Sequence, residues 1–262
     1  MSKQILIVGA GWSGSVIARK LADAGCHVTI VEERDHIGGN CYDFTNEYGE
    51  LIHKYGPHLM HHNNDRVHEF LLSHGNWGTY EHRVKALHRY KQVDLPVNLG
   101  TLRHMFGNHD KDVLVQKLED AKVNVEVTNT DELFLASYGH EISNIFFRPY
   151  TKLMWDCDPS EIEASVGARL KPRMSEDDRY FLDKYQYMPE HGYTKIFESI
   201  LDHENITVKL STSADSIESE SEFDHVFTSQ SPDSYYDYVL GELPYRSIKF
   251  RNITTDEQIV WP

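Results

Sequence analysis

The most constraining feature of this sequence is a glycine-rich turn placed between an apolar run and a helical pattern. Residues 5 to 8 read Ile-Leu-Ile-Val, and Gly9-Ala10-Gly11-Trp12-Ser13-Gly14 follows them directly. A second apolar run, residues 28 to 31, ends on Glu32. This order of strand, glycine turn, helix, strand and acidic residue is typical of a dinucleotide-binding unit. We therefore predict that the three glycines shape a pyrophosphate site and that Glu32 accepts hydrogen bonds from a ribose.

A second glycine pair, Gly38-Gly39, follows the acidic residue and is flanked by Arg34 and Asn40. Such a pair lets the backbone pass close under a long cofactor, because neither residue carries a side chain. This continuation resembles flavoproteins of the amine-oxidase and mutase kind rather than nicotinamide dehydrogenases. FAD is therefore the predicted cofactor.

Charge and composition exclude several other classes of protein. The formal net charge of −15 argues against a nucleic-acid binder or a protein that binds anionic membranes, because phosphate contacts need clustered Lys and Arg. The three cysteines have no paired spacing, which indicates a reducing compartment without a disulfide framework. No apolar run reaches about 18 residues, and the first strand begins too early for a signal peptide, so a cytoplasmic protein is expected. The sixteen histidines are scattered, and no metal site is predicted.

The order of patterns along the chain predicts an α/β fold with an insertion. Strand-like runs return at residues 206–210 and 225–228, after a stretch of helical periodicity that begins near residue 99. We predict a Rossmann-like FAD-binding domain from residues 1–75 and 196–232. Residues 76–98 and 233–262 are assigned to an incomplete antiparallel sheet, and residues 99–195 to a helical insertion that carries the substrate pocket.

Several separate motifs resemble one family, that of UDP-galactopyranose mutase. In chain order they are Arg34 to Asn40, His53 to His61, Tyr150 to Trp155, Asp178 to Phe181, Met188 to Thr194 and Pro244 to Phe250. The resemblance covers essentially the whole chain. It implies an isomerase that interconverts UDP-galactopyranose and UDP-galactofuranose, a sugar nucleotide used for cell-surface polysaccharides. In that family reduced FAD attacks the anomeric carbon through N5, and NAD(P)H is needed only to reduce the flavin.

The resemblance also implies roles for individual residues. His61 falls beside the flavin ring, and Arg169 falls at the mobile-loop arginine that closes over the substrate diphosphate, which gives the two catalytic candidates. Cofactor contacts are implied for Gly9, Gly11, Ser13, Gly14, Glu32, Glu33, Gly39, Asn40, His58 and Leu59. Substrate contacts are implied for His82, Phe147, Tyr150, Thr151, Trp155, Arg169 and Tyr180. Without the resemblance, Trp155 reads as a helix-end anchor and Arg169 as a surface charge.

Two departures from the family leave alternatives open. His82 stands where the family usually has asparagine, so the preferred nucleotide sugar can differ. Family members continue for roughly a further hundred residues beyond the last match, so weak or absent activity of this chain alone is expected, and a homodimer or a carboxy-terminal partner segment is a candidate. The alternatives are a flavin amine oxidase or desaturase and a non-catalytic nucleotide-binding fragment of a split mutase.

Overall fold

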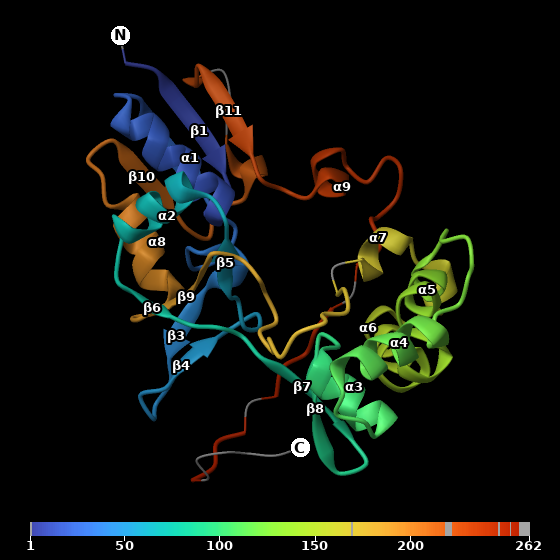
Figure 1. Cartoon of the computed structure of the whole chain (residues 1–262). Coiled ribbons are helices and arrows are strands. Elements are labelled where there is room, and N and C mark those ends of the chain that lie inside the picture. Colours follow the sequence, from blue (N-terminus) through green and yellow to red (C-terminus); the bar gives the residue numbers. More distant parts are fainter. Residues whose placement is uncertain (1, 169, 218–221, 246, 252, 257–262) are drawn as a thin grey trace. The chain divides into compact units, whose positions relative to one another are not determined.

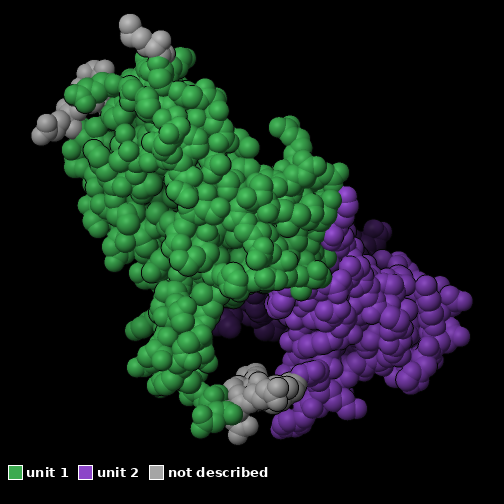
Figure 2. Space-filling view, turned by 90° about the vertical axis from the view of Figure 1, so that its left-hand side faces the viewer, with its two compact units in different colours: residues 1–79, 185–262 green, residues 80–184 purple. Residues whose placement is uncertain are grey.

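The computed structural model of the chain describes residues 2–168, 170–217, 222–245, 247–251 and 253–256 (Figure 1). The chain forms two compact units. Unit 1 combines Met1–Thr79 with Tyr185–Pro262, and unit 2 is the continuous segment Tyr80–Lys184 (Figure 2). The helical insertion is therefore bounded at residues 80 and 184, and the hairpin assigned by sequence to a separate sheet region belongs to unit 2. In the described ranges, no helix combines the length and the apolar character needed to cross a membrane.

A four-stranded parallel sheet forms the centre of unit 1. Its strands are β1 (Gln4–Val8), β2 (His27–Val31), β10 (Ile206–Lys209) and β11 (His225–Thr228), in the order β10-β2-β1-β11. Ile5 pairs with His225, so the late strand completes the sheet that the first strand begins. The predicted Rossmann-like fold, with returning strands after an insertion, is confirmed.

The first helix, α1 (Trp12–Asp23), packs on this sheet through small residues. Its buried positions are Gly14, Ser15, Ala18 and Ala22. Gly14, Ala18 and Ala22 are four residues apart on one face, and this row of small residues brings the helix axis close to the strands. Ile5, Ile7, Val28 and Ile30 from the sheet share one apolar core with Ala18 and Ala22. Helix α8 (Tyr193–Leu201) packs beside α1.

Short elements complete unit 1. A three-stranded antiparallel sheet has the order β5-β9-β6, from Met60–His62, Tyr185–Pro189 and Trp77–Thr79. The strands β3 (Asp43–Thr45) and β4 (Leu51–His53) form a hairpin, which residues 46–50 connect. Helix α2 (Asp65–Leu72) starts on Asn64, whose side chain accepts hydrogen bonds from the N–H groups of Arg66 and Val67. The remaining elements are the 3₁₀ turns Gly39–Cys41 and Ala214–Ser216 and helix α9 (Pro232–Tyr235).

A buried carboxylate from β3 caps the start of α8. Asp43 is 3% exposed, and its two oxygens accept the N–H groups of Tyr193 and Thr194 at 2.5 and 2.9 Å. The Thr194 hydroxyl in turn donates to the carbonyl of Asp43 at 2.8 Å. Gly192 precedes the helix at φ +86°, and a Cβ there would lie 2.7 Å from the Asp43 carboxylate. This cap joins the two chain segments of unit 1, residues 1–79 and 185–262, through hydrogen bonds.

Replacing Asp43 with alanine is expected to destabilise unit 1 by about 3 kcal/mol, because two buried N–H groups lose a charged acceptor. Asp43→Asn keeps one acceptor oxygen and is expected to cost about half as much. Urea unfolding followed by circular dichroism measures both. Asp202→Ala, at the exposed far end of α8, is the matched control and is expected to leave the midpoint unchanged. Equal midpoints for Asp43→Ala and wild type would contradict the capping role.

Unit 2 is mainly helical and starts with a hairpin, β7 (Val84–His88) and β8 (Lys91–Leu95). Its core combines Val93 and Val97 with residues from the helices that follow. These helices are α3 (Leu99–Phe106), α4 (Lys111–Ala121), α5 (Thr130–Ile142), α6 (Arg148–Trp155) and α7 (Ala164–Gly167), with a π-helical turn at Ser143–Phe147 and a 3₁₀ turn at Pro159–Glu161.

Helix α5 begins at a side-chain cap and is kinked further along. Asn129 and Glu132 form a reciprocal capping box at its start. The helix is then kinked at Gly139, which has φ +74°. A Cβ at Gly139 would lie closer than 3.0 Å to the carbonyl oxygen of Ala121, so α4 can pack against the kink only because no side chain is present.

Candidate functional site

Helix α1 begins without a side-chain cap for its leading backbone N–H groups. Gly11 is the N-cap residue and offers no side chain, and the first turn of α1 carries no acidic residue. The leading N–H groups of a helix lack intrahelical partners and carry a partial positive charge. Gly9 adopts φ +100°, which turns the chain sharply off the strand. This end of α1 can therefore hold an anion such as a pyrophosphate.

Glu32 lies at the end of β2, next to this turn, and is 8% exposed. Its Oε2 accepts the N–H of Ala10 at 2.8 Å, and its Oε1 accepts the N–H of Arg34 at 3.0 Å. These bonds fix the carboxylate at the strand end. A carboxylate has about four acceptor positions, so two bonds leave room for further donors such as ribose hydroxyls.

Arg34 is a candidate site residue that the sequence analysis did not assign. Its guanidinium lies over the Tyr55 ring, 4.5 Å from the centroid, and Nη2 donates to the Asn40 side chain at 3.1 Å. Its Nη1 is buried without a hydrogen-bond partner in the described part of the chain. A buried cationic donor of this kind calls for an anionic partner. The signal was present in the sequence, as a basic residue between the acidic strand end and the glycine pair.

A cavity of about 680 Å³ opens at this edge of the parallel sheet. Six predicted cofactor residues line it, namely Gly9, Gly11, Glu32, Glu33, Gly39 and Asn40. Val8, Val31 and Arg34 also line it. Its other walls come from residues that sequence reasoning missed, which follow the carboxyl ends of β10 and β11: Thr212, Ser213, Ala214, Ser229, Gln230, Ser231, Ser234, Tyr238 and Tyr245. Ligands of open parallel sheets bind at this edge, so strand order supplies the missing signal.

The remaining predicted cofactor residues lie elsewhere in unit 1. Ser13 is exposed in the first turn of α1, and Gly14 is buried against the sheet. His58 and Leu59 precede β5, and the carbonyl of His58 accepts the Tyr193 hydroxyl at 3.1 Å. His61 is the middle residue of β5, paired in register with Gln186 of β9.

The substrate residues predicted on the helices of unit 2 divide into buried and exposed positions. Phe147 is 4% exposed and stacks on Tyr138, with ring centroids 4.4 Å apart, so it belongs to the core of unit 2. Thr151 is also buried. Tyr150 and Trp155 on α6 are 55% and 48% exposed, which leaves aromatic faces open to a ligand. Arg169 lies outside the described residues.

His82 and Tyr180 are brought together within unit 2. The Tyr180 N–H donates to the His82 carbonyl at 2.6 Å, and the two rings lie edge to face at 5.8 Å. The Tyr80 hydroxyl lies 3.3 Å from Nδ1 of His82, and burial lowers the pKa of the imidazole below its ordinary value. The Arg173 guanidinium donates to the carbonyl of Tyr180 at 2.8 Å and so holds the segment that carries it. A neutral imidazole in this setting can both donate and accept hydrogen bonds.

Comparison with protein families connects these residues to known proteins. Residues 145–260 match the family model GLF, described as UDP-galactopyranose mutase. Residues 7–72 match the model of an NAD(P)-binding Rossmann-like domain. The two matches fall on the segments that carry the predicted substrate and cofactor motifs.

Several curated relatives match nearly the whole chain. A probable UDP-galactopyranose mutase of Klebsiella pneumoniae is 39% identical over 258 residues, which cover 97% of this chain and 67% of the relative. A dTDP-fucopyranose mutase of Escherichia coli is 37% identical over 264 residues, which cover 97% of this chain and 70% of the relative.

Among solved structures, a crystal structure of reduced UDP-galactopyranose mutase shares the fold. It has a TM-score of 0.60 at 20% identity, and the match covers 79% of this chain and 49% of that chain. The chain therefore spans 67 to 70% of the curated relatives and about half of the solved one.

Proposed function

This chain belongs to the UDP-galactopyranose mutase family, and from that premise we propose that it binds FAD in unit 1 and a nucleoside diphosphate sugar in unit 2. The proposed reaction interconverts the pyranose and furanose forms of the sugar while it remains attached to the diphosphate. NAD(P)H is the proposed reductant of the flavin, and the cytoplasm is the proposed compartment.

The observation that carries the cofactor proposal is the close approach of two glycines at the cavity of unit 1. A Cβ on Gly39 would lie 3.1 Å from the Cα of Gly11, so side chains at this point would fill the space between the two loops. Arg34 adds a buried cationic donor at the same cavity. These residues fit a pyrophosphate, with the N-terminus of α1 and Arg34 supplying positive charge and Glu32 supplying the ribose acceptor.

When bound, a reduced flavin supplies the nucleophile for the anomeric carbon, which is chemistry that no side chain of this chain replaces. The protein then has three tasks: to hold the cofactor, to hold the sugar nucleotide and to stabilise the diphosphate as it departs. We assign the last task to Arg169, because a guanidinium can bind two phosphate oxygens at once. We assign His61 to the neighbourhood of the flavin ring.

For the sugar nucleotide, we propose that Tyr150 and Trp155 supply stacking faces for the base. Both rings are exposed on α6. Aromatic faces stack on nucleobases, and this stacking does not require specific hydrogen bonds to the base. His82 and Tyr180 are proposed to contact the sugar, with the neutral imidazole of His82 able to accept from a hydroxyl. Phe147 and Thr151 are buried, and we propose that they support this surface from below.

A second candidate substrate is a dTDP-linked sugar. The relative at 37% identity is named dTDP-fucopyranose mutase, and its level of similarity to this chain is close to that of the UDP-galactopyranose mutase relative. The two candidates differ in the base and in the sugar, while the proposed chemistry is the same. Parallel titrations with UDP and dTDP therefore separate them.

Replacing Trp155 with alanine is expected to weaken UDP binding by about 1–3 kcal/mol, the range found for the loss of one stacked aromatic. Calorimetric titration of the FAD-reconstituted chain with UDP measures this, and its visible spectrum reports flavin occupancy. Leu153→Ala removes a more exposed neighbour on α6 and is the matched control, with no change expected. Equal affinities for wild type and Trp155→Ala would remove Trp155 from the site, and the absence of bound flavin would contradict the cofactor assignment.

A further inference from the structure

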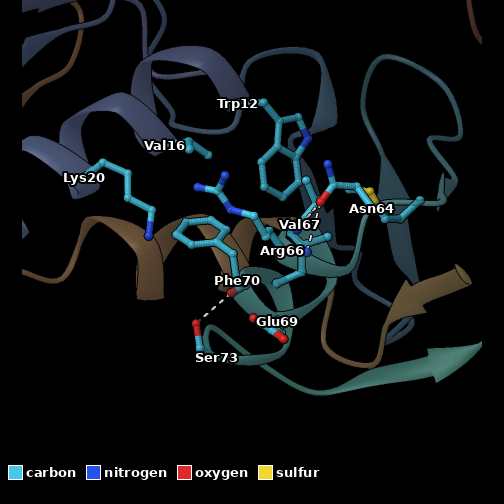
Figure 3. Close-up of a pocket in the computed structure, with 11 residues that line it drawn as sticks. Trp12, Val16, Lys20, Asn64, Arg66, Val67, Glu69, Phe70 and Ser73 are labelled. Atoms are coloured by element: carbon cyan, nitrogen blue, oxygen red, sulfur yellow. Dashed lines mark hydrogen bonds between the residues drawn. The ribbon is translucent and has the colours of Figure 1, made fainter.

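A groove between α1 and α2 lies outside the site described above. It has a volume of about 710 Å³ and an apolar floor, which α1, β5 and α2 contribute: Trp12, Val16, Met60, Val67 and Phe70. We call it the α1–α2 groove. Figure 3 shows Trp12, Val16 and Lys20 projecting from α1 toward Phe70 and Arg66 of α2. Val67 remains 40% exposed, although its neighbour Leu71 is buried.

The floor of the α1–α2 groove is apolar because its polar atoms are already used. The indole N–H of Trp12 donates to the Cys41 sulfur at 3.2 Å, so the carbon face of the ring faces the groove. The Asn64 side chain caps α2, and the Ser73 hydroxyl donates to the carbonyl of Phe70 at 2.7 Å. Exposed apolar surface of this extent commonly marks a site of interaction with another molecule.

Two cations flank the groove without a carboxylate partner. Lys20 places its Nζ 4.6 Å from the centre of the Phe70 ring. Across the described ranges, no carboxylate lies within ion-pair distance of Lys20 or Arg66. Glu69 also lines the groove, and Figure 3 shows it on the outer side of α2, away from Lys20. In a chain with a net charge of −15, two uncompensated cations beside an apolar floor indicate an acidic partner.

The spacing of the lining residues indicates the shape of that partner. Trp12, Val16 and Lys20 follow one another at intervals of four along α1, and Arg66, Phe70 and Ser73 follow at four and three along α2. Two such rows form the walls into which the side chains of a third helix interdigitate. The row on α1 spans about 12 Å, which corresponds to two helical turns of a ligand.

We propose that the α1–α2 groove docks an amphipathic helix with an apolar stripe toward Trp12, Val16 and Phe70 and acidic residues toward Lys20 and Arg66. This helix belongs to a protein partner with a negatively charged helical segment. The binding mode is independent of the cofactor and the sugar nucleotide.

The test uses two synthetic helices, each of about 15 residues and held helical by a hydrocarbon staple. Both carry leucine at i, i+3, i+4 and i+7, and the leucine stripe is flanked by glutamate in one peptide and by lysine in the other. Fluorescence anisotropy with the full chain is expected to show saturable one-to-one binding of the glutamate peptide. The lysine peptide is expected to bind at least about tenfold more weakly, the combined effect of two exposed ion pairs.

Charge reversal makes the test specific. The double variant Lys20→Glu/Arg66→Glu is expected to prefer the lysine peptide, while Lys3→Glu/Lys111→Glu, which changes the net charge equally at distant exposed positions, is expected to keep the original preference. Val16→Glu places a charge on the floor and is expected to abolish binding of both peptides, with circular dichroism confirming its fold.

Equal affinity for the two peptides, or a preference unchanged by the charge reversal, overturns the proposal. Binding of decanoate with the same charge dependence, without binding of either peptide, would assign the groove to a small amphipathic anion instead. A dimer in sedimentation velocity that Val16→Glu abolishes would assign it to a second copy of this chain. Either result also overturns the helix proposal.

Discussion

Replacing Gly14 with alanine is expected to unfold unit 1 at urea concentrations at which the wild-type protein remains native. A Cβ at Gly14 would lie closer than 3.0 Å to the carbonyl oxygen of Gly9, and the side chain of Ile7 is the next neighbour at 3.2 Å. A carbonyl of the glycine turn cannot rotate aside as a flexible side chain can, so α1 must move away from the sheet. An extra carbon in a packed interface lowers the free energy of unfolding by up to about 3 kcal/mol. We expect Gly14→Ala to lie at the upper end of this range, because the atom that its Cβ meets belongs to the backbone.

The matched control is Gly11→Ala, a glycine-to-alanine substitution at the N-cap position of the same helix. A Cβ at Gly11 meets Gly39 at 3.8 Å, an ordinary contact, and the φ of Gly11 is −79°. Gly11→Ala is therefore expected to unfold within a few tenths of a kcal/mol of wild type. Urea titrations monitored by circular dichroism compare the two variants. If Gly14→Ala and Gly11→Ala have the same urea midpoint, the tight approach of α1 to the sheet does not stabilise unit 1 as described.

Replacing Gly11 with valine is expected to abolish flavin binding while leaving the fold intact, the opposite outcome to Gly14→Ala. The branched side chain would enter the cavity where a pyrophosphate must approach the backbone, between Gly11 and Gly39. We expect the affinity for FAD to fall by at least about 100-fold, because neither the phosphates nor the two loops can withdraw without losing their hydrogen bonds.

Reconstitution with FAD, gel filtration and the visible spectrum measure the retained flavin. Gly78→Val is the matched control, because Gly78 lies in β6 away from the cavity and a Cβ there makes an ordinary contact at 3.8 Å. Unchanged flavin content in Gly11→Val would count against the cofactor site, whereas loss of flavin in both variants would point to a general effect on folding.

Features encoded by neighbouring residues were predictable from sequence. The strand, glycine turn and helix at the start of the chain are local, and so are the caps that Asn98 and Asn129 provide for α3 and α5. The hairpin β7–β8 lies within residues 76–98, which the sequence analysis assigned to an antiparallel sheet. The return of β11 to the first sheet was predictable because an apolar run after an inserted domain has few other partners.

Features that depend on pairings across the chain were not predictable in the same way. The sheet β5-β9-β6 joins three-residue strands to a segment more than a hundred positions away, and such short runs carry little periodicity. The cap that Asp43 provides for α8 joins equally distant positions. Gly139 reads as a tolerated helical glycine until its contact with Ala121 is known.

For the candidate site, residue type was more readily predicted than burial. Tyr150 and Phe147 looked alike as aromatic candidates, yet the first is half exposed and the second stacks on Tyr138 in the core. Helical periodicity near the π-helical turn does not separate these two positions, because the turn rotates the faces of the helix. The assignment of these residues to a sugar-nucleotide pocket stays a prediction.

The division of unit 1 into two chain segments has a consequence for how the protein is made. On a ribosome that adds about 5–20 residues per second, β1 and β2 emerge several seconds before β10 and β11, their neighbours in the sheet. All of unit 2 is synthesised in between, and it is one continuous segment with its own core. Unit 2 can therefore fold while the first half of unit 1 still waits for its partner strands. During that interval β1 and β2 expose hydrogen-bonding edges, so vectorial synthesis makes this half-sheet the natural client of a nascent-chain chaperone.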